Sequence, residues 1–291
     1  MLPPPADCLA TLPPSLQPYQ ALIAPTLAPC VVLTLAKSRK KTAGPEGRIG
    51  GLPTWPVAKP YPTGSNGTPL VLFAQLNFQE LPPVLEGFPR QGLLQVFLHP
   101  SDTLYGQNHE DDFDQANWRL VYHPEVPTEV LTDYGFLTDY LPGSDVVLPH
   151  NPKTVFGFDY QPGWCPLGVD DGRFNAYLPA LSYEANDALW DDYAAWATSR
   201  GTLLGGHPAF YNQGDPRETD PFPPDSWYAQ PAAERPPYLD TRISEPLQLL
   251  QADSYKAEIL WGDAGTAHWF IEPSDLAALR FDRVRFTWSC G

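Results

Sequence analysis

The chain has 291 residues, of which 43% are hydrophobic, and a formal net charge of −16 at pH 7. This length and apolar content suffice for one large core or two moderate ones. Nucleic acids and anionic membranes attract positive proteins, so the charge argues against both as main partners. There is no apolar run of about 18 residues and no basic leader before an apolar stretch, which predicts a cytoplasmic protein without a membrane span.

Proline is frequent, with 36 residues, more than twice the roughly 5% of average usage. Each proline removes a backbone donor and disfavours helix in the preceding residue, so long helices should be few. The four cysteines show no short paired spacing, which indicates neither a disulfide framework nor a zinc knuckle. We therefore expect reduced thiols and a strand-dominated α+β fold.

The first half of the chain reads mostly as sheet. Residues 31–36 form an apolar, β-branched run long enough for a buried strand. Alternating apolar segments follow at 70–75, 93–98 and 119–122. In the first of these, strict alternation predicts two faces: Leu70, Leu72 and Ala74 on one, and Val71, Phe73 and Gln75 on the other.

Two helices are predicted in the second half. The longer one spans 183–199, with apolar residues three and four apart, a cap at Ser182 and an end at Gly201. The shorter one runs from Pro273 to Leu279, because proline suits the first helical position. A last strand follows, in which Val284, Phe286 and Trp288 share one face.

The order of segments also indicates an internal repeat. Two similar series occur: Gly50-Gly51-x-Pro, strand 70–77 and a strand led by Gly92; then Gly205-Gly206-x-Pro, strand 247–253 and a strand led by Gly265. We predict a single domain, 1–291, with two fused β-rich lobes, 30–180 and 200–291, joined by the helix at 183–199. The groove between such lobes would be the natural ligand site.

Polar residues beside the repeated strands are the candidate groove residues: Gln75, Asn77, Gln251, Asp253, Asp263 and His268. In the structural interpretation, Asp263 closes a turn and His268 is a buried histidine with a satisfied ring. In the functional interpretation, the cluster recognises a small polar ligand or a peptide. If the protein is instead an enzyme on a small polar or carbohydrate-like substrate, Asp263 and His268 are the candidate acid and base.

Other chemistries find little support in the sequence. No Gly-x-Ser-x-Gly elbow occurs, and both Gly-Gly pairs precede x-Pro instead of the start of a helix. Metal ligands are offered by one acidic segment, His109, Glu110, Asp111 and Asp112. That segment lacks the glycine and terminal glutamate of an EF-hand loop, and acidic surface loops are common. We expect no cofactor.

Charge points to a different mode of binding. Residues 101–160 contain 11 acidic side chains against only Arg119 and Lys153. Such a segment is either a solvated face or a docking surface for a basic partner.

Four parts of the chain carry motifs of one known family: Gly50-Gly51-Leu52-Pro53-Thr54-Trp55-Pro56; Leu72–Asn77 with Gly92–Phe97; Gly205-Gly206-His207-Pro208 with Gln213–Arg217; and Trp261–Ile271 with Val284–Cys290. They resemble the YwqG-like family of bacterial proteins, whose biochemical role is unassigned. The resemblance implies a fold, and it brings a suspicion of regulatory or immunity-type roles. Many relatives carry cysteine pairs near the first element, but Lys59-Pro60-Tyr61-Pro62 stands there, so no zinc site is implied.

With no catalytic apparatus identified, the sequence favours a non-enzymatic binding or interaction protein. It would use the inter-lobe groove or the acidic surface, with a basic protein partner or a small polar ligand.

Overall fold

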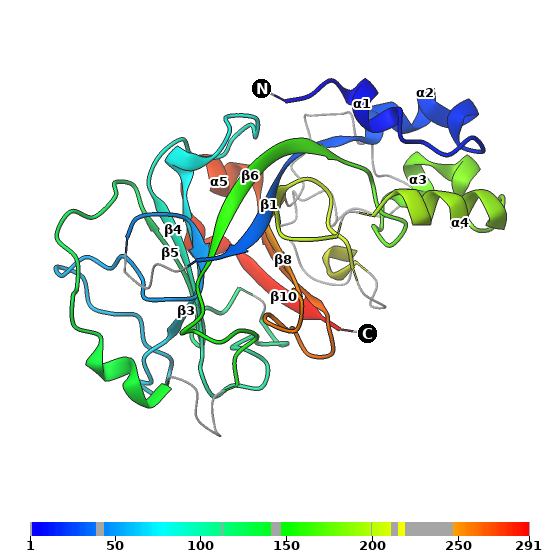
Figure 1. Cartoon of the computed structure of the whole chain (residues 1–291). Coiled ribbons are helices and arrows are strands. Elements are labelled where there is room, and N and C mark those ends of the chain that lie inside the picture. The colour runs from blue at the N-terminus through cyan, green and yellow to red at the C-terminus, as the bar shows by residue number, and fades with distance from the viewer. Residues whose placement is uncertain are drawn as a thin grey trace.

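The computed structural model describes residues 2–38, 44–111, 113–140, 147–198, 200–210, 215–218 and 247–290. Ten strands form one antiparallel sheet, in the order β10-β9-β8-β7-β1-β6-β2-β3-β4-β5, which curls into a half-barrel (Figure 1). The strands are β1 Ala28–Lys37, β2 Arg48–Ile49, β3 Val71–Asn77, β4 Leu93–Leu98, β5 Trp118–His123, β6 Phe156–Cys165, β7 Leu203–Gly205, β8 Leu247–Asp253, β9 Thr266–Ile271 and β10 Arg285–Ser289. The predicted strand-dominated fold with few helices is confirmed.

Helices are short. The α-helices are α1 Pro5–Leu9, α2 Gln20–Ile23, α3 Phe174–Tyr177, α4 Asp187–Trp196 and α5 Pro273–Ala277. The 3₁₀ turns are η1 Gln17–Tyr19, η2 Ala24–Thr26, η3 Phe78–Glu80, η4 Gly135–Tyr140, η5 Pro179–Leu181, η6 Pro216–Glu218 and η9 Phe281–Arg283. None of the helices in the described ranges has the length and apolarity needed to cross a bilayer.

The two long strands β1 and β6 lie at the middle of the sheet. They pair from Ala28 opposite Cys165 to Lys37 opposite Phe156. β7 adds to β1, and β2 adds to β6. The N-terminal strand β1 therefore lies beside the C-terminal strands β7–β10, and β6 lies beside the earlier strands β2–β5. Two lobes and an internal duplication stay predictions, since all ten strands form one sheet.

One predicted face in β3 is wrong. The register of β3 against β4 shifts between Leu72 and Ala74, which marks a β-bulge at Phe73. A bulge inserts one extra residue and reverses the alternation beyond it. Phe73 and Ala74 consequently both join the main core cluster, while Leu72 joins a smaller cluster with Trp55. β8 has the same irregularity against β9.

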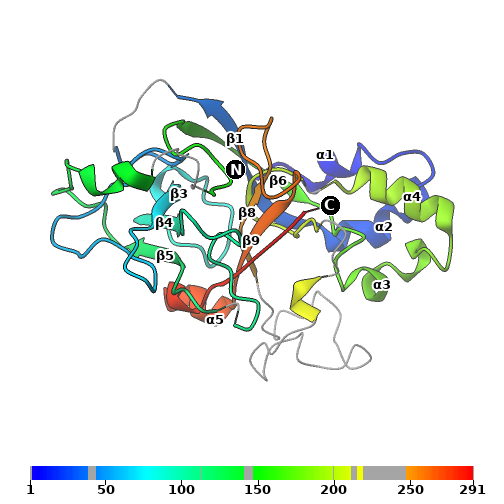
Figure 2. The same ribbon diagram turned by 90° about the horizontal axis from the view of Figure 1, so that it is seen from below.

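Aromatic side chains of the main core lie between the facing sides of the curled sheet. Phe73 of β3 stacks on Trp269 of β9 with ring centroids 5.9 Å apart. Trp269 in turn stacks on Phe286 at 4.9 Å. A second core cluster, around Tyr193 and Phe174, belongs to the helices α1–α4, which gather at one side of the molecule (Figure 2).

The two helix predictions differ in accuracy. The longer helix, α4, starts at Asp187 because the side chain of Asn186 accepts a hydrogen bond from Leu189 N at 3.0 Å. The carbonyl of Ser182, the predicted cap, accepts hydrogen bonds in a separate turn before the helix. The shorter helix begins at Pro273, as predicted, and ends before Leu279, which has φ 57°.

Glycine is required at the first Gly-Gly turn. Gly50 has φ 74°, and a Cβ atom there would lie 2.2 Å from the carbonyl oxygen of Thr154. We expect Gly50→Ala to lower the free energy of unfolding by about 3 kcal/mol, through left-handed strain and a forced backbone shift. Gly67→Ala is the control, because Gly67 has φ 81° with no atom within 4 Å of its Cβ position. It should cost only about 1 kcal/mol; equal losses in urea unfolding would contradict the clash argument.

Candidate functional site

Gln75, on β3, is fully buried and bound to backbone groups. Its Oε1 accepts a hydrogen bond from Thr54 N at 3.0 Å, and its Nε2 donates to the carbonyl of Glu46 at 3.0 Å. These bonds fasten the segments before and after the first Gly-Gly turn to the sheet. Asn77 accepts from Gln79 N at 3.1 Å and so caps η3.

The same pattern recurs on β8. Gln251 is fully buried; its Oε1 accepts from Ala209 N at 3.0 Å, and its Nε2 donates to Gly201 O at 3.0 Å. The neighbouring Asp253 accepts from Thr266 Oγ1 at 2.8 Å and from Gly201 N at 3.0 Å. Each glutamine is thus bound within its own side of the sheet, and their joint use in one groove stays a prediction.

His268 lies opposite Gln251 in the β8–β9 register. It is buried, with its ring 5.0 Å from Phe210 and 5.7 Å from Phe270. Burial lowers the pKa of His268 to about 3, and repulsion from Arg217 adds to the effect. Asp263 is exposed in the turn before β9. No hydrogen bond or ion pair joins Asp263 to His268 among the described residues, so their acid–base role stays a prediction.

The acidic segment predicted as a metal candidate is exposed. Glu110 N donates to the side chain of Asn108 at 3.0 Å, and Asp111 accepts from Phe113 N at 3.0 Å. His109 is also exposed, and Asp112 lies outside the described residues. A search confined to the described ranges finds no three His, Cys, Asp or Glu side chains placed to hold a metal ion. A site here stays a prediction.

A pocket of about 460 Å³ lies where β2 pairs with β6. Glu80, at the end of η3, accepts hydrogen bonds from Gly47 N at 2.9 Å and from Tyr160 Oη at 3.3 Å. Burial, with the neighbouring Glu80 charge, raises the pKa of the Tyr160 phenol. The rings of Tyr160 and Phe158 lie 5.8 Å apart and form one wall.

Arg48 also lines this pocket, but its guanidinium binds backbone carbonyls. Nη1 donates to Gly44 O at 2.6 Å and to Glu46 O at 2.8 Å, and Nη2 donates to Leu52 O. Burial lowers the pKa of Arg48 to about 10, so the side chain stays charged at neutral pH. Its role here is to hold the chain around the first Gly-Gly turn.

A second pocket, of about 490 Å³, lies beside the end of β5 and is lined by His123, Lys59 and a proline-rich loop. His123 is only 3% exposed. Its Nε2 lies 3.1 Å from Gln95 Oε1, and its Nδ1 lies 3.4 Å from Lys59 Nζ. Gln95 Nε2 donates to Gln75 Oε1 at 2.8 Å. A chain of hydrogen bonds therefore connects His123 in this pocket, through Gln95, to the buried Gln75.

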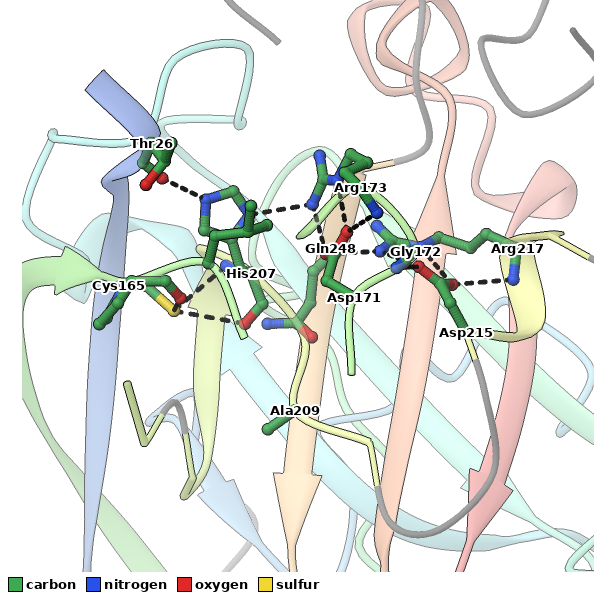
Figure 3. Close-up of polar contacts among 12 residues, drawn as sticks. Thr26, Cys165, Asp171, Gly172, Arg173, His207, Ala209, Asp215, Arg217 and Gln248 are labelled. Carbon is green, nitrogen blue, oxygen red and sulfur yellow. Dashed lines mark hydrogen bonds and ion pairs between the residues drawn. The ribbon is translucent and has the colours of Figure 1, made fainter. Parts of the chain in front are cut away.

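A buried ion network lies beside β7–β9 and joins two Asp-x-Arg segments (Figure 3). Asp171 accepts from Arg173 at 2.7 and 2.6 Å and from Arg217 at 2.9 Å. Arg217 also binds Asp215 at 2.8 and 2.6 Å. Burial alone would raise the pKa of Asp171, but Arg173 and Arg217 hold it below the ordinary range.

His207 extends the network toward the helices. Its Nδ1 lies 2.9 Å from Arg173 Nη2, and its Nε2 donates to Thr26 O at 2.7 Å. Burial and the nearby Arg173 lower the pKa of His207 to about 3, so the imidazole is neutral and accepts from the guanidinium. Arg217 also lies over the Phe270 ring of β9, at 5.1 Å. The network thus joins the segment before α3 to the sheet.

Residues 47–290 match the profile of a protein family described as a domain of unknown function, DUF1963. The chain belongs to this family. The DUF1963 match includes both Gly-Gly turns and all strands except β1, which the sheet places at its centre. None of the curated proteins gives a significant match.

The sequence prediction missed the ion network of this DUF1963 chain, although a local signal is present. Asp171-Gly-Arg173 and Asp215-Pro-Arg217 are two of the three Asp-x-Arg triplets in the sequence; the third, Asp240-Thr-Arg242, lies outside the described residues. In each of the first two, Asp Oδ1 accepts from the backbone N of the arginine at 3.0 Å and from its Nε. The repeated triplet could have identified two local arginine–aspartate pairs.

Proposed function

We propose that this protein is a cytoplasmic, YwqG-like member of DUF1963 that binds an organic cation in the pocket between β2 and β6. The observation that supports this most directly is the Glu80 carboxylate beside the Tyr160 and Phe158 rings in a pocket of about 460 Å³. The shared chemistry is an ammonium or guanidinium group, from a free small molecule or from a basic side chain of a partner protein.

The polar groups of the pocket favour a positive ligand. Glu80 Oε2 accepts two hydrogen bonds, while its Oε1 receives none from the described residues. A carboxylate oxygen facing a cation forms a charge-assisted hydrogen bond, and the flanking aromatic faces attract the same cation. Arg48, the cationic side chain among the described lining residues, is occupied by backbone carbonyls. The net charge of −16 adds long-range attraction for a basic partner.

We also infer an internal duplication, in which each repeat contributes its long strand to the opposite side of the sheet. The two bulges lie two residues before Gln75 and two before Gln251. Each of these glutamines accepts, at 3.0 Å, from the backbone N four residues after the first glycine of its Gly-Gly turn. The repeats would be β1–β5 and β6–β10, so the cation pocket would lie where strands of different repeats pair.

Glu80→Gln tests the cation site. Glutamine keeps an acceptor for Gly47 N but removes the charge, so we expect the affinity for butylguanidinium to fall about tenfold or more. Tyr160→Phe keeps the aromatic wall and removes one hydrogen bond to Glu80, so it should weaken binding about threefold. Glu184→Gln is the control. Glu184 is exposed and does not line the pocket, and the substitution changes the net charge by the same amount as Glu80→Gln. Isothermal titration calorimetry measures the affinity of the wild type and of the three variants for butylguanidinium.

Two ligands distinguish the sources of the cation. If butylguanidinium and an otherwise neutral arginine peptide bind equally, the pocket takes a small molecule or a lone side chain. If only the peptide binds, a protein partner is indicated. Equal affinities of wild type, Glu80→Gln and Glu184→Gln would contradict the proposed pocket.

A further inference from the structure

We infer that the pocket beside His123 is a second binding site, and that it takes a carboxylate next to an N–H donor. An N-acylated amino acid and the C-terminus of a peptide both present that pair of groups. The inference rests on a fixed histidine tautomer, an adjacent lysine and an apolar wall, and it is independent of the cation pocket.

The tautomer follows from backbone groups whose hydrogen-bonding roles cannot change. Thr54 N donates to Gln75 Oε1 at 3.0 Å, which fixes the oxygen of that amide. Gln95 donates through Nε2 to this oxygen and to Thr54 O, at 2.8 and 3.1 Å. Gln95 Oε1 is therefore an acceptor, and His123 Nε2, 3.1 Å away, must carry the proton. His123 Nδ1 is left with a lone pair.

That lone pair is directed toward the pocket and Lys59. The ammonium of Lys59 donates to Nδ1 at 3.4 Å in this structure, and Lys59 as a residue is exposed. The lysine backbone is held in place because Trp55 Nε1 donates to Lys59 O at 3.0 Å. The ring of Trp55 also packs edge-on against His123, with centroids 5.3 Å apart. The acceptor Nδ1 thus belongs to a ring that is held in place by packing, whereas the neighbouring ammonium belongs to the flexible Lys59 side chain.

Burial lowers the pKa of His123 to about 4, and the nearby Lys59 charge adds to the shift. The imidazole is accordingly neutral near pH 7, and Nδ1 can accept a hydrogen bond. Of the remaining lining residues, Pro56, Pro124, Val126 and Pro127 are apolar, and Glu125 and Thr128 are polar and exposed. Prolines offer few backbone donors and little freedom to move. The wall suits an aliphatic side chain.

These groups match an acylated amino acid in a specific way. The ligand amide N–H would replace the Lys59 ammonium as the donor to His123 Nδ1, Lys59 would pair with the ligand carboxylate instead, and the ligand side chain would lie on the proline wall. A free carboxylate lacks the donor, and an amide lacks the charge. A free amino acid replaces the amide N–H with an ammonium, which Lys59 would repel.

The test uses N-acetylleucine as the probe, observed by heteronuclear NMR titration of the full chain. We expect saturable binding that weakens about tenfold for N-acetylleucinamide and about tenfold for N-acetyl-N-methylleucine, which lacks the N–H. Lys59→Met should weaken the binding of N-acetylleucine to the affinity that the wild type has for N-acetylleucinamide. Lys153→Met, at an exposed lysine outside the pocket, is the control and should bind as wild type does.

A peptide ending in leucine, compared with its C-terminal amide, separates the two sources of the ligand. Tighter binding of the peptide acid than of N-acetylleucine identifies a protein C-terminus, and equal binding identifies the small molecule; both support the site. The long-range ¹H–¹⁵N spectrum of His123 should show a protonated Nε2 in the free protein. Absence of saturable binding by both acids, or a protonated Nδ1, would overturn the inference.

Discussion

Replacing Arg217 by methionine is expected to lower the free energy of unfolding by about 3–5 kcal/mol, because it removes a cation that pairs with two buried carboxylates. Arg217 is 1% exposed and forms ion pairs with Asp215 and Asp171, whose side chains are fully buried. Asp171 keeps its ion pair with Arg173 in the variant, and Asp215 loses the ion pair with Arg217. Methionine fills much of the volume of the arginine side chain, so the lost stability comes mainly from the removed charge and not from a cavity.

Arg280→Met is the matched control for this substitution. Arg280 pairs with Asp275 at 3.4 Å, but its side chain is 54% exposed. An exposed pair contributes roughly 0–1 kcal/mol, so the two variants should differ by several kcal/mol in urea unfolding. If both lose the same small amount, the network is hydrated and its carboxylates do not depend on Arg217. A double variant, Asp215→Asn with Arg217→Met, should recover part of the loss, since it also removes one of the buried negative charges that Arg217 balances.

The sequence predicted the strands well because their signal is local. Alternation and β-branched runs at 31–36, 70–77 and 93–98 each correspond to a strand. The bulge at Phe73 escaped the prediction, since an inserted residue changes the alternation without changing composition. The start of α4 was misplaced for a similar reason: Ser182 and Asn186 are both good caps, and only the turn before the helix decides between them.

The candidate site was harder to predict than the fold. Gln75 and Gln251 look like ligand-binding residues in the sequence, but in the structure each amide binds backbone groups of its own side of the sheet. A sequence does not say which partner a polar side chain meets. The same limit hid the ion network, because Asp171 and Arg217 are 46 residues apart along the chain. The sequence also did not predict His123 as a site residue, since its partners Gln95 and Lys59 are distant from it along the chain.

Acid is expected to unfold this protein well above the pKa of ordinary carboxylates. Besides His123, whose pKa is also lowered to about 4, three fully buried histidines have lowered pKa values: about 4 for His150, about 3 for His207 and about 3 for His268. Burial is the main cause for each. In the unfolded chain a histidine has a pKa near 6.5, so between about pH 6.5 and pH 4 the unfolded state binds more protons. Stability is therefore complete above pH 6.5 and falls as the pH decreases.

The expected loss is large. Each buried histidine contributes up to about 1.4 kcal/mol per pH unit in this window, which gives roughly 5–6 kcal/mol for the three between pH 7 and pH 5. That is comparable to the total stability of many domains, about 5–15 kcal/mol. Urea unfolding at pH 7, 6 and 5 measures it. A change below about 1 kcal/mol over this range would contradict the neutral, buried state of these side chains.

A single substitution assigns the effect to particular residues. His268 packs against the rings of both Phe210 and Phe270, where phenylalanine should be tolerated. His268→Phe removes one of the three titrating groups, so the loss between pH 7 and pH 5 should shrink by about 2 kcal/mol. His109→Gln, at an exposed position, should leave the pH dependence unchanged. If both variants keep the wild-type slope, the acid sensitivity arises elsewhere and His268 is protonated in the folded protein.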